Sequence, residues 1–106
     1  MRAIRVHQHG GPEAMALDDV ATPTPGPGQA LVRLHTAGVN FIDVYFRTGL
    51  YKADLPAGLG NEGAGVVEAV GEGVTDIKIG ERVAYAMSRG AYADYAVVPA
   101  AALVHV

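Results

Sequence analysis

Hydrophobic and polar residues alternate in several short runs near the start of the chain. The clearest run covers residues 29–36, and an alternation of this kind is typical of a half-buried strand. Its predicted shared face consists of Ala30, Val32, Leu34 and Thr36. Two shorter β-rich runs, residues 2–7 and 15–20, precede it, and the turn signal GGPE separates them. The pattern predicts a strand for each of these runs.

The spacing becomes helical in the segment GVNFIDVYFRTGLY. The residues that recur at helical spacing there are Phe41, Val44, Tyr45 and Thr48. Asn40 precedes them and is a residue type favoured at a helix N-cap, while Gly49 suits the left-handed residue that ends a helix. We expect one short helix here.

The second half of the chain is rich in glycine, with nine of the fourteen glycines between positions 49 and 90. Short β-rich runs lie among them. They cover residues 63–70, 82–86, 91–98 and 103–106. Many short strands with glycine and proline turns predict a mainly β fold, either a barrel or a sandwich.

Composition removes several classes of function. The net charge of −3 arises from scattered acids, and no Lys/Arg cluster marks a nucleic-acid partner. No cysteine is present, which excludes disulfides and thiolate zinc sites and is typical of a reducing compartment. The most apolar stretch, residues 95–104, is about half a membrane span and contains a proline. We therefore expect a cytoplasmic protein with no membrane partner.

The stretch GLGNEG, residues 58–63, matches the G-x-G-x-x-G pattern of dinucleotide-binding folds. That pattern binds pyrophosphate only where it joins a strand to a helix. Here YKADLPA precedes it without an apolar run, and the residues that follow favour a strand. We interpret these glycines as turn residues and as points where backbone approaches backbone or substrate, with no role in clasping a pyrophosphate.

Longer stretches carry a family resemblance. They are AIRVHQHGGPE, PTPGPGQALVRL, GVNFIDVYFRTGLY, LPAGLGNEGAGVVEAVGEGVTDIKIGERVAY and GAYADYAVV. Taken in this order, they resemble the N-terminal, GroES-like part of medium-chain dehydrogenases/reductases, and within that superfamily the quinone oxidoreductases. The resemblance implies a GroES-like, partly open β-barrel with one or two short helices, spanning residues 1–106.

The zinc alcohol dehydrogenases of the same superfamily carry a cysteine ligand where this sequence has Asn40, and a histidine ligand where it has Asn61. Asp43 and Glu62 remain at the neighbouring motif positions. Neutral amides are poor substitutes, because catalytic zinc needs about three N, O or S ligands. The resemblance therefore implies a zinc-independent NADPH:quinone oxidoreductase, which transfers hydride to a quinone or enone without a metal.

A metal-free reductase must stabilise the oxyanion that forms on its substrate with hydrogen-bond donors. The catalytic candidates are Asn40, Tyr45, Tyr51 and Asn61. By resemblance, the nicotinamide end of the cofactor would contact Asn40, Phe41, Ile42, Asp43 and Tyr45. Two of these residues have simpler interpretations, since Asn40 also suits a helix cap and Tyr45 also suits helix packing.

Asp43 and Glu62 are interpreted as structural, because hydride addition to a quinone can draw its proton from solvent. We expect Asp43 to orient a nearby donor and Glu62 to accept hydrogen bonds from turn amides.

The resemblance also implies a nucleotide-binding domain that this chain lacks. We therefore expect the 106 residues alone to be inactive, to bind NADPH weakly, and to expose an apolar surface that favours a homo-oligomer. A non-enzymatic GroES-like assembly module is the alternative from another functional class.

Overall fold

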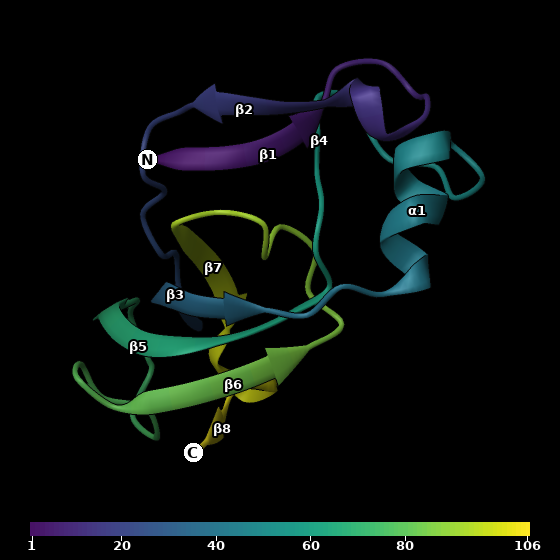
Figure 1. Ribbon diagram of the computed structural model, residues 1–106. Coiled ribbons are helices and arrows are strands. Elements are labelled where there is room, and N and C mark those ends of the chain that lie inside the picture. The colour runs from purple at the N-terminus through teal and green to yellow at the C-terminus, as the bar shows by residue number, and fades with distance from the viewer.

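The computed structural model describes all 106 residues as two antiparallel sheets beside one α-helix (Figure 1). The elements are β1 (Arg2–Val6), a 3₁₀ turn (Pro12–Ala14), β2 (Met15–Asp19), β3 (Gln29–Ala37), α1 (Phe41–Thr48), β4 (Ala57–Gly58), β5 (Glu62–Val70), β6 (Arg82–Ala86), β7 (Tyr95–Pro99), a second 3₁₀ turn (Ala100–Ala102) and β8 (Val104–His105). The sheets have the strand orders β2-β1-β4 and β7-β3-β5-β6-β8. They do not close on each other, which confirms the mainly β, partly open barrel expected from the sequence.

Each sheet buries its own hydrophobic cluster. The large sheet covers a cluster of ten buried residues that includes Val32, Val67, Val83 and Val98. The small sheet covers Val6, together with Ala57 and Leu59, and α1 adds Phe46 to this second cluster. The helix therefore packs beside the small sheet, at one end of the molecule (Figure 1).

The segment just before β7 joins the two sheets. Ala93 forms an isolated antiparallel bridge with Ala3 of β1, and the amide of Ile4 donates to the carbonyl of Tyr92 at 2.7 Å. On its other side, the amide of Leu34 in β3 donates to the carbonyl of Asp94 at 2.9 Å. The single strand predicted for residues 91–98 was therefore wrong, because its first half pairs with one sheet and its second half with the other.

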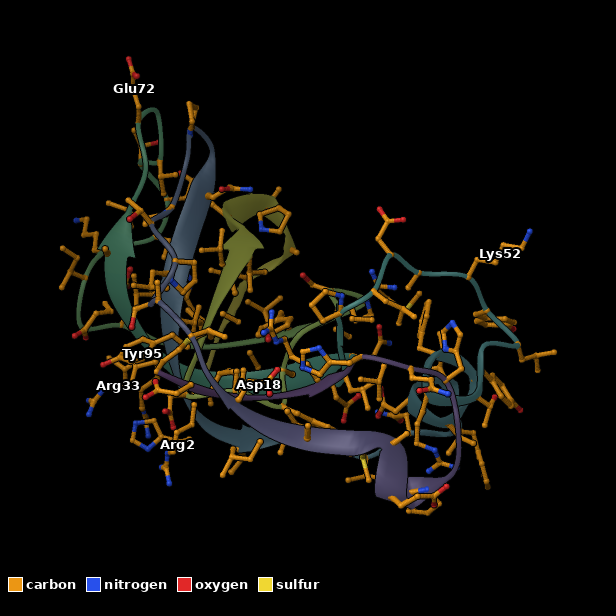
Figure 2. The ribbon with its side chains drawn as sticks, turned by 90° about the horizontal axis from the view of Figure 1, so that it is seen from above. Arg2, Asp18, Arg33, Lys52, Glu72 and Tyr95 are labelled. Carbon is orange, nitrogen blue, oxygen red and sulfur yellow. The ribbon has the colours of Figure 1, made fainter.

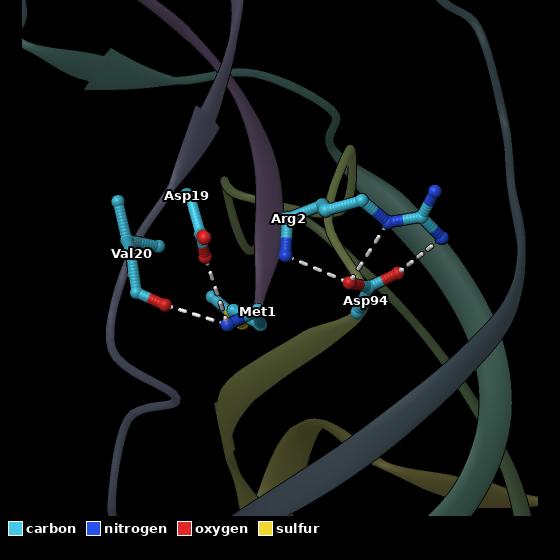
Figure 3. A network of polar contacts seen from close by, with 5 residues as sticks. All are labelled: Met1, Arg2, Asp19, Val20 and Asp94. Carbon is cyan, nitrogen blue, oxygen red and sulfur yellow. Dashed lines mark hydrogen bonds and ion pairs between the residues drawn. The ribbon is translucent and has the colours of Figure 1, made fainter.

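Figure 3 shows the polar contacts at this junction. The Asp94 carboxylate accepts from the backbone amide of Arg2 at 2.7 Å, and the Arg2 guanidinium lies 3.4 Å from it. Both donations lower the pKa of Asp94, the backbone hydrogen bond most. Beside this pair, the N-terminal ammonium of Met1 donates to the carbonyl of Val20 at 2.6 Å. The start of β1 is thereby attached both to the end of β2 and to the segment before β7.

Helix α1 has the predicted ends. Asn40 is the extended N-cap and Gly49 ends the helix with φ of 89°. Its predicted face was wrong, because Phe41 is 83% exposed while Asp43 is the one buried residue of the helix. Asp43 and Phe46 lie one turn apart and both face inward. The buried Asp43 side chain therefore determines which face of the helix points into the protein.

The GLGNEG stretch contains no strand-to-helix turn, as expected. It runs from β4 into β5, and both flanking elements are strands. Gly60 has φ of 93°, and a Cβ there would lie 2.7 Å from the Tyr92 amide nitrogen. At Gly63 a Cβ would lie 2.9 Å from the side chain of Leu34. These glycines permit a turn and a close strand pairing.

No helix in the structure has the length and apolar character needed to cross a bilayer.

Gly65 provides a direct test of close packing between β3 and β5. A Cβ at this position would overlap the carbonyl oxygen of Arg33, whereas a Cβ at Gly58 in β4 would lie 3.4 Å from the nearest atom, an ordinary contact. We expect Gly65→Ala to lower the free energy of unfolding by about 3 kcal/mol, because backbone must move to accommodate the methyl group. Gly58→Ala, the matched control, should cost less than about 1 kcal/mol. Urea unfolding of both variants measures the difference, and equal costs would contradict the proposed clash.

Candidate active site

The candidate site begins where the chain enters α1. The backbone amide of Asn40 donates to Asp43 Oδ2 at 3.0 Å, and the amide of Asp43 donates to the Asn40 carbonyl at 3.1 Å. An acid in the first turn also interacts favourably with the helix dipole. These contacts fix the backbone of Asn40 relative to the helix.

The carboxylate of Asp43 also holds two distant segments. It is 5% exposed, and Oδ1 accepts from the amide of Gly60 at 3.1 Å. Oδ2 accepts from the hydroxyl of Tyr92 at 2.8 Å. A buried carboxylate is costly unless such donors compensate it, and donors of this kind form strong hydrogen bonds to an anion. Asp43 therefore orients nearby donors, as the sequence predicted, and joins three segments of the chain.

The same contact changes the titration of Tyr92. Burial, and after it the hydrogen bond to Asp43, raises the pKa of Tyr92 to about 12. Tyr92 was not among the residues selected from the sequence. Its hydroxyl meets a carboxylate 49 residues away in the chain, and no local pattern indicates a pairing at that separation.

The side chain of Asn40 carries an unused donor. Its Nδ2 is buried and has no hydrogen-bond partner. The only other buried polar side-chain atom without a hydrogen-bond partner is Tyr85 Oη. A buried donor without an acceptor costs about 1–3 kcal/mol. An acceptor oxygen on a bound molecule would remove that cost at Asn40.

Three aromatic rings lie together after the helix start. The ring centroid of Tyr51 is 5.2 Å from that of Tyr45 and 5.7 Å from that of Phe46. The amide of Tyr51 donates to the carbonyl of Tyr45 at 3.1 Å, so the chain folds back over the helix. Tyr51 is 46% exposed. The structure thus brings Tyr45 and Tyr51 together as one aromatic wall, defined as Tyr45, Phe46 and Tyr51.

Asn61 follows Gly60 directly, so Asp43 positions it through the backbone. Its Nδ2 lies 3.6 Å from Met87 Sδ, and its carbonyl accepts from the amide of Ser88 at 3.3 Å. Met87 has φ of 64°, which is unusual for a residue with a side chain. Asn61 therefore contacts the loop after β6 and makes no hydrogen bond with Asn40.

Glu62 does not have the predicted contacts. Its carboxylate accepts no hydrogen bond from a turn amide and lies over Gly38, where a Cβ would overlap it. The expected role was wrong, because Glu62 is exposed at the start of β5 and needs no buried donors. Of the remaining predicted cofactor contacts, Ile42 is half-buried and Phe41 exposes its ring at the helix start.

The donor set does not suit a metal. No group of three or more His, Cys, Asp or Glu side chains that could hold an ion occurs in the structure. Asn40 and Asn61 offer neutral amides, and both oxygens of Asp43 already accept hydrogen bonds. Zinc, which needs about three N, O or S ligands, does not fit these residues.

Comparison with known proteins gives consistent matches. A family model described as the alcohol dehydrogenase GroES-like domain matches residues 26–106. The quinone oxidoreductase of Pseudomonas aeruginosa is 49% identical over 106 residues, covering 98% of this chain and 33% of that protein. The chain therefore spans about a third of the length of this relative.

Solved structures match over the whole chain. The Escherichia coli quinone oxidoreductase complexed with NADPH has a TM-score of 0.97 and 40% identity, with 100% of this chain and 33% of that chain covered. A cobalt- and zinc-bound thermostable alcohol dehydrogenase from Pyrobaculum aerophilum has a TM-score of 0.93 and 34% identity, with 100% and 41% covered. Backbone similarity alone does not separate metal-binding from NADPH-bound relatives.

The pairing of Asp43 with Tyr92 can be measured by a double-mutant cycle. We expect Asp43→Asn and Tyr92→Phe to show a coupling energy of about 1–2 kcal/mol in urea unfolding at neutral pH, because the first variant removes the charge of the acceptor and the second removes the donor. Tyr95→Phe is the control, since the Tyr95 hydroxyl has no hydrogen-bond partner within the chain.

The pH dependence of this coupling has a defined sign. The folded-state pKa of Tyr92 lies above its ordinary value of 10.0, so the contribution should be complete below pH 10 and should be lost as the pH rises toward about 12. A coupling energy near zero at neutral pH would contradict the central role of Asp43.

Proposed function

The chain belongs to the family of alcohol dehydrogenase GroES-like domains, and on that premise we propose that it is the substrate-side part of an NADPH-dependent quinone oxidoreductase. The reaction is hydride transfer from the nicotinamide to a quinone or enone. Residues outside this chain would supply the nucleotide-binding domain, because the relatives that it matches are about three times as long.

One observation carries the proposal: the buried Nδ2 of Asn40 lacks an acceptor, close in the chain to an aromatic wall. A carbonyl oxygen that gains negative charge during reduction is an acceptor of the required kind. A preorganised amide donor stabilises such an oxygen without the cost of reorienting water. Asn40 is therefore proposed to bind the substrate oxygen, with Asn61 as a second amide donor.

The remaining candidate residues have supporting roles. Tyr45 and Tyr51 offer flat apolar surface for a quinone ring, and their hydroxyls are further donors. Asn40, Phe41, Ile42, Asp43 and Tyr45 would line the nicotinamide end of the cofactor. NADPH, when bound, supplies the hydride. Asp43 acts as a positioning residue, because its carboxylate holds the Asn40 amide and the Gly60 turn in place.

The metal-free branch of the superfamily is favoured by the side chains at two positions. An NADPH-complexed relative and a cobalt- and zinc-bound relative share this backbone, so the side chains at the site must distinguish the two kinds of chemistry. Two amides at positions 40 and 61 and a fully hydrogen-bonded Asp43 support hydrogen-bond catalysis over a zinc centre.

The activity can be tested by joining this chain to the remaining two-thirds of the Pseudomonas aeruginosa relative. We expect NADPH-dependent quinone reduction, and we expect Asn40→Ser to lower kcat/KM about 100-fold, the usual effect of removing one oxyanion donor. Serine retains the N-cap preference, so the urea midpoint should change little.

Three results would contradict this assignment or the role of Asn40 in it. Asn40→Ser with kcat/KM close to that of the parent would show that the amide serves only as a helix cap. Activity that a chelator abolishes and zinc restores would instead support a metal-dependent alcohol dehydrogenase. A correctly folded hybrid without activity would favour the non-enzymatic assembly module.

The isolated chain should bind NADPH weakly, because it offers contacts to only one end of the cofactor. A fluorescence titration of the 106-residue chain should therefore show no saturation at micromolar NADPH. The hybrid protein serves as the positive control. Saturable micromolar binding by the chain alone would contradict the division of cofactor contacts proposed here.

A further inference from the structure

We propose that this chain also contains a binding site for an oxyanion, the carboxylate or phosphate group of a small acidic molecule. The site is a cavity of about 480 Å³ beside the C-terminal end of α1. Its lining residues are His9, Lys52, Ala53, Asp54 and Arg89. The predicted quinone and cofactor contacts do not include any of these residues.

Arg89 is the cavity residue best suited to bind an anion, because its guanidinium lies over an aromatic ring. The guanidinium carbon lies 4.5 Å from the ring centroid of Phe46, a cation–π contact. An arginine held in this way has already lost much of its side-chain freedom, so less entropy is lost when it binds a ligand. Its N–H groups make no hydrogen bond or ion pair within the protein, and this fork of donors matches the two oxygens of a carboxylate or phosphate.

The charges around the cavity do not neutralise one another. Lys52, Asp54 and Arg89 lie on it, yet no ion pair joins any of them. Two arginines elsewhere in the chain do form ion pairs. Arg5 contacts Asp18 at 2.7 Å, and Arg2 contacts Asp94 at 3.4 Å. A net positive cavity in a chain whose total charge is −3 is therefore a local feature that favours an anion.

The walls of the cavity are held on two sides. A Cβ at Gly49 would lie 2.9 Å from the His9 ring, so this ring packs directly against the end of α1. The amide of Gly10 donates to the carbonyl of Arg47 at 3.1 Å, which fastens the loop that carries His9 to the helix. Lys52 lines the cavity from the loop after α1, and its side chain extends outward from that loop (Figure 2).

The cavity adjoins the aromatic wall through Phe46, which contacts Arg89 and Tyr51. If the proposed function holds, an anion at Arg89 would lie near a quinone stacked on Tyr51. The site would then favour quinones or enones that carry an acidic group. This consequence rests on the proposed function, whereas anion binding itself does not.

Anion binding is tested on the 106-residue chain by NMR titration with sodium phosphate and, separately, sodium acetate, at constant ionic strength. We expect saturable shifts of the backbone amides of Lys52, Asp54, Arg89 and Gly90. Arg89→Gln should weaken binding at least about 10-fold, which corresponds to the loss of about 1.4 kcal/mol. Arg89→Lys should weaken it by a similar factor for acetate, because the charge remains while the fork of donors is lost.

Arg33→Gln is the matched control, since Arg33 is an exposed arginine on β3 without an ion pair, far from the cavity in sequence. It should leave the affinity unchanged. Shifts that grow linearly without saturation, or equal affinities for Arg89→Gln and Arg33→Gln, would overturn the site. Saturation by only one of the two anions would identify the group that the cavity prefers.

The link to catalysis is tested separately in the hybrid enzyme, by comparing a quinone carrying a carboxylate with its neutral parent. Arg89→Gln should reduce kcat/KM for the acidic quinone about 10-fold and leave that for the neutral quinone unchanged. Equal effects on the two quinones would refute the substrate subsite while leaving both the anion site and the reductase activity standing.

Discussion

The arrangement of the site depends on one buried carboxylate. Asp43 accepts hydrogen bonds from the amide of Asn40, the amide of Gly60 and the hydroxyl of Tyr92. These donors belong to the helix entry, to the turn between β4 and β5, and to the segment that joins the sheets. Because a buried carboxylate without donors would be strongly unfavourable, the three segments must meet at this point whenever the chain is folded. The backbones next to Asn40 and Asn61 are thereby tied to the same carboxylate, although the two side chains make no hydrogen bond with each other.

Backbone hydrogen bonds make this meeting point rigid. The amide of Tyr92 donates to the carbonyl of Leu59 at 2.9 Å, and the amide of Gly90 donates to the carbonyl of Gly60 at 2.9 Å. These bonds pair two of the three segments that supply donors to Asp43, those of Gly60 and Tyr92. Gly60 must adopt positive φ for its amide to face the carboxylate while its carbonyl faces Gly90, and its lack of a Cβ leaves room for Tyr92. At Gly60, the glycine of the G-x-G-x-x-G pattern is thus explained by backbone conformation and close packing.

Local rules predicted the elements but not their contacts. The N-cap preference of Asn40 and the left-handed preference of Gly49 located α1 correctly, because both act within one turn of the chain. Helical spacing placed Phe41 on the apolar face, yet the hydrogen bonds of Asp43 turn that ring outward. The division of residues 91–98 between two sheets depends on partners about 60 to 90 residues away, such as Leu34 and Ala3. The spacing of hydrophobic residues within one segment carries no information about partners so distant in the chain. The contacts of Tyr92 and Arg89 also depend on distant residues, so the sequence did not reveal these two residues as candidates.

An NADPH-complexed quinone oxidoreductase and a cobalt- and zinc-bound alcohol dehydrogenase both share this backbone. The carboxylate of Asp43 already uses both oxygens, so it has little capacity left for an ion. A metal centre would therefore need its ligands from other positions, and the resemblance to zinc alcohol dehydrogenases locates two of them at 40 and 61. Replacing both asparagines by cysteine and histidine would provide two such ligands, and the third of the roughly three that catalytic zinc requires would have to come from another position. In the proposed function, the chemistry therefore depends on the side chains of Asn40 and Asn61, while Asp43 preserves the backbone geometry that positions them.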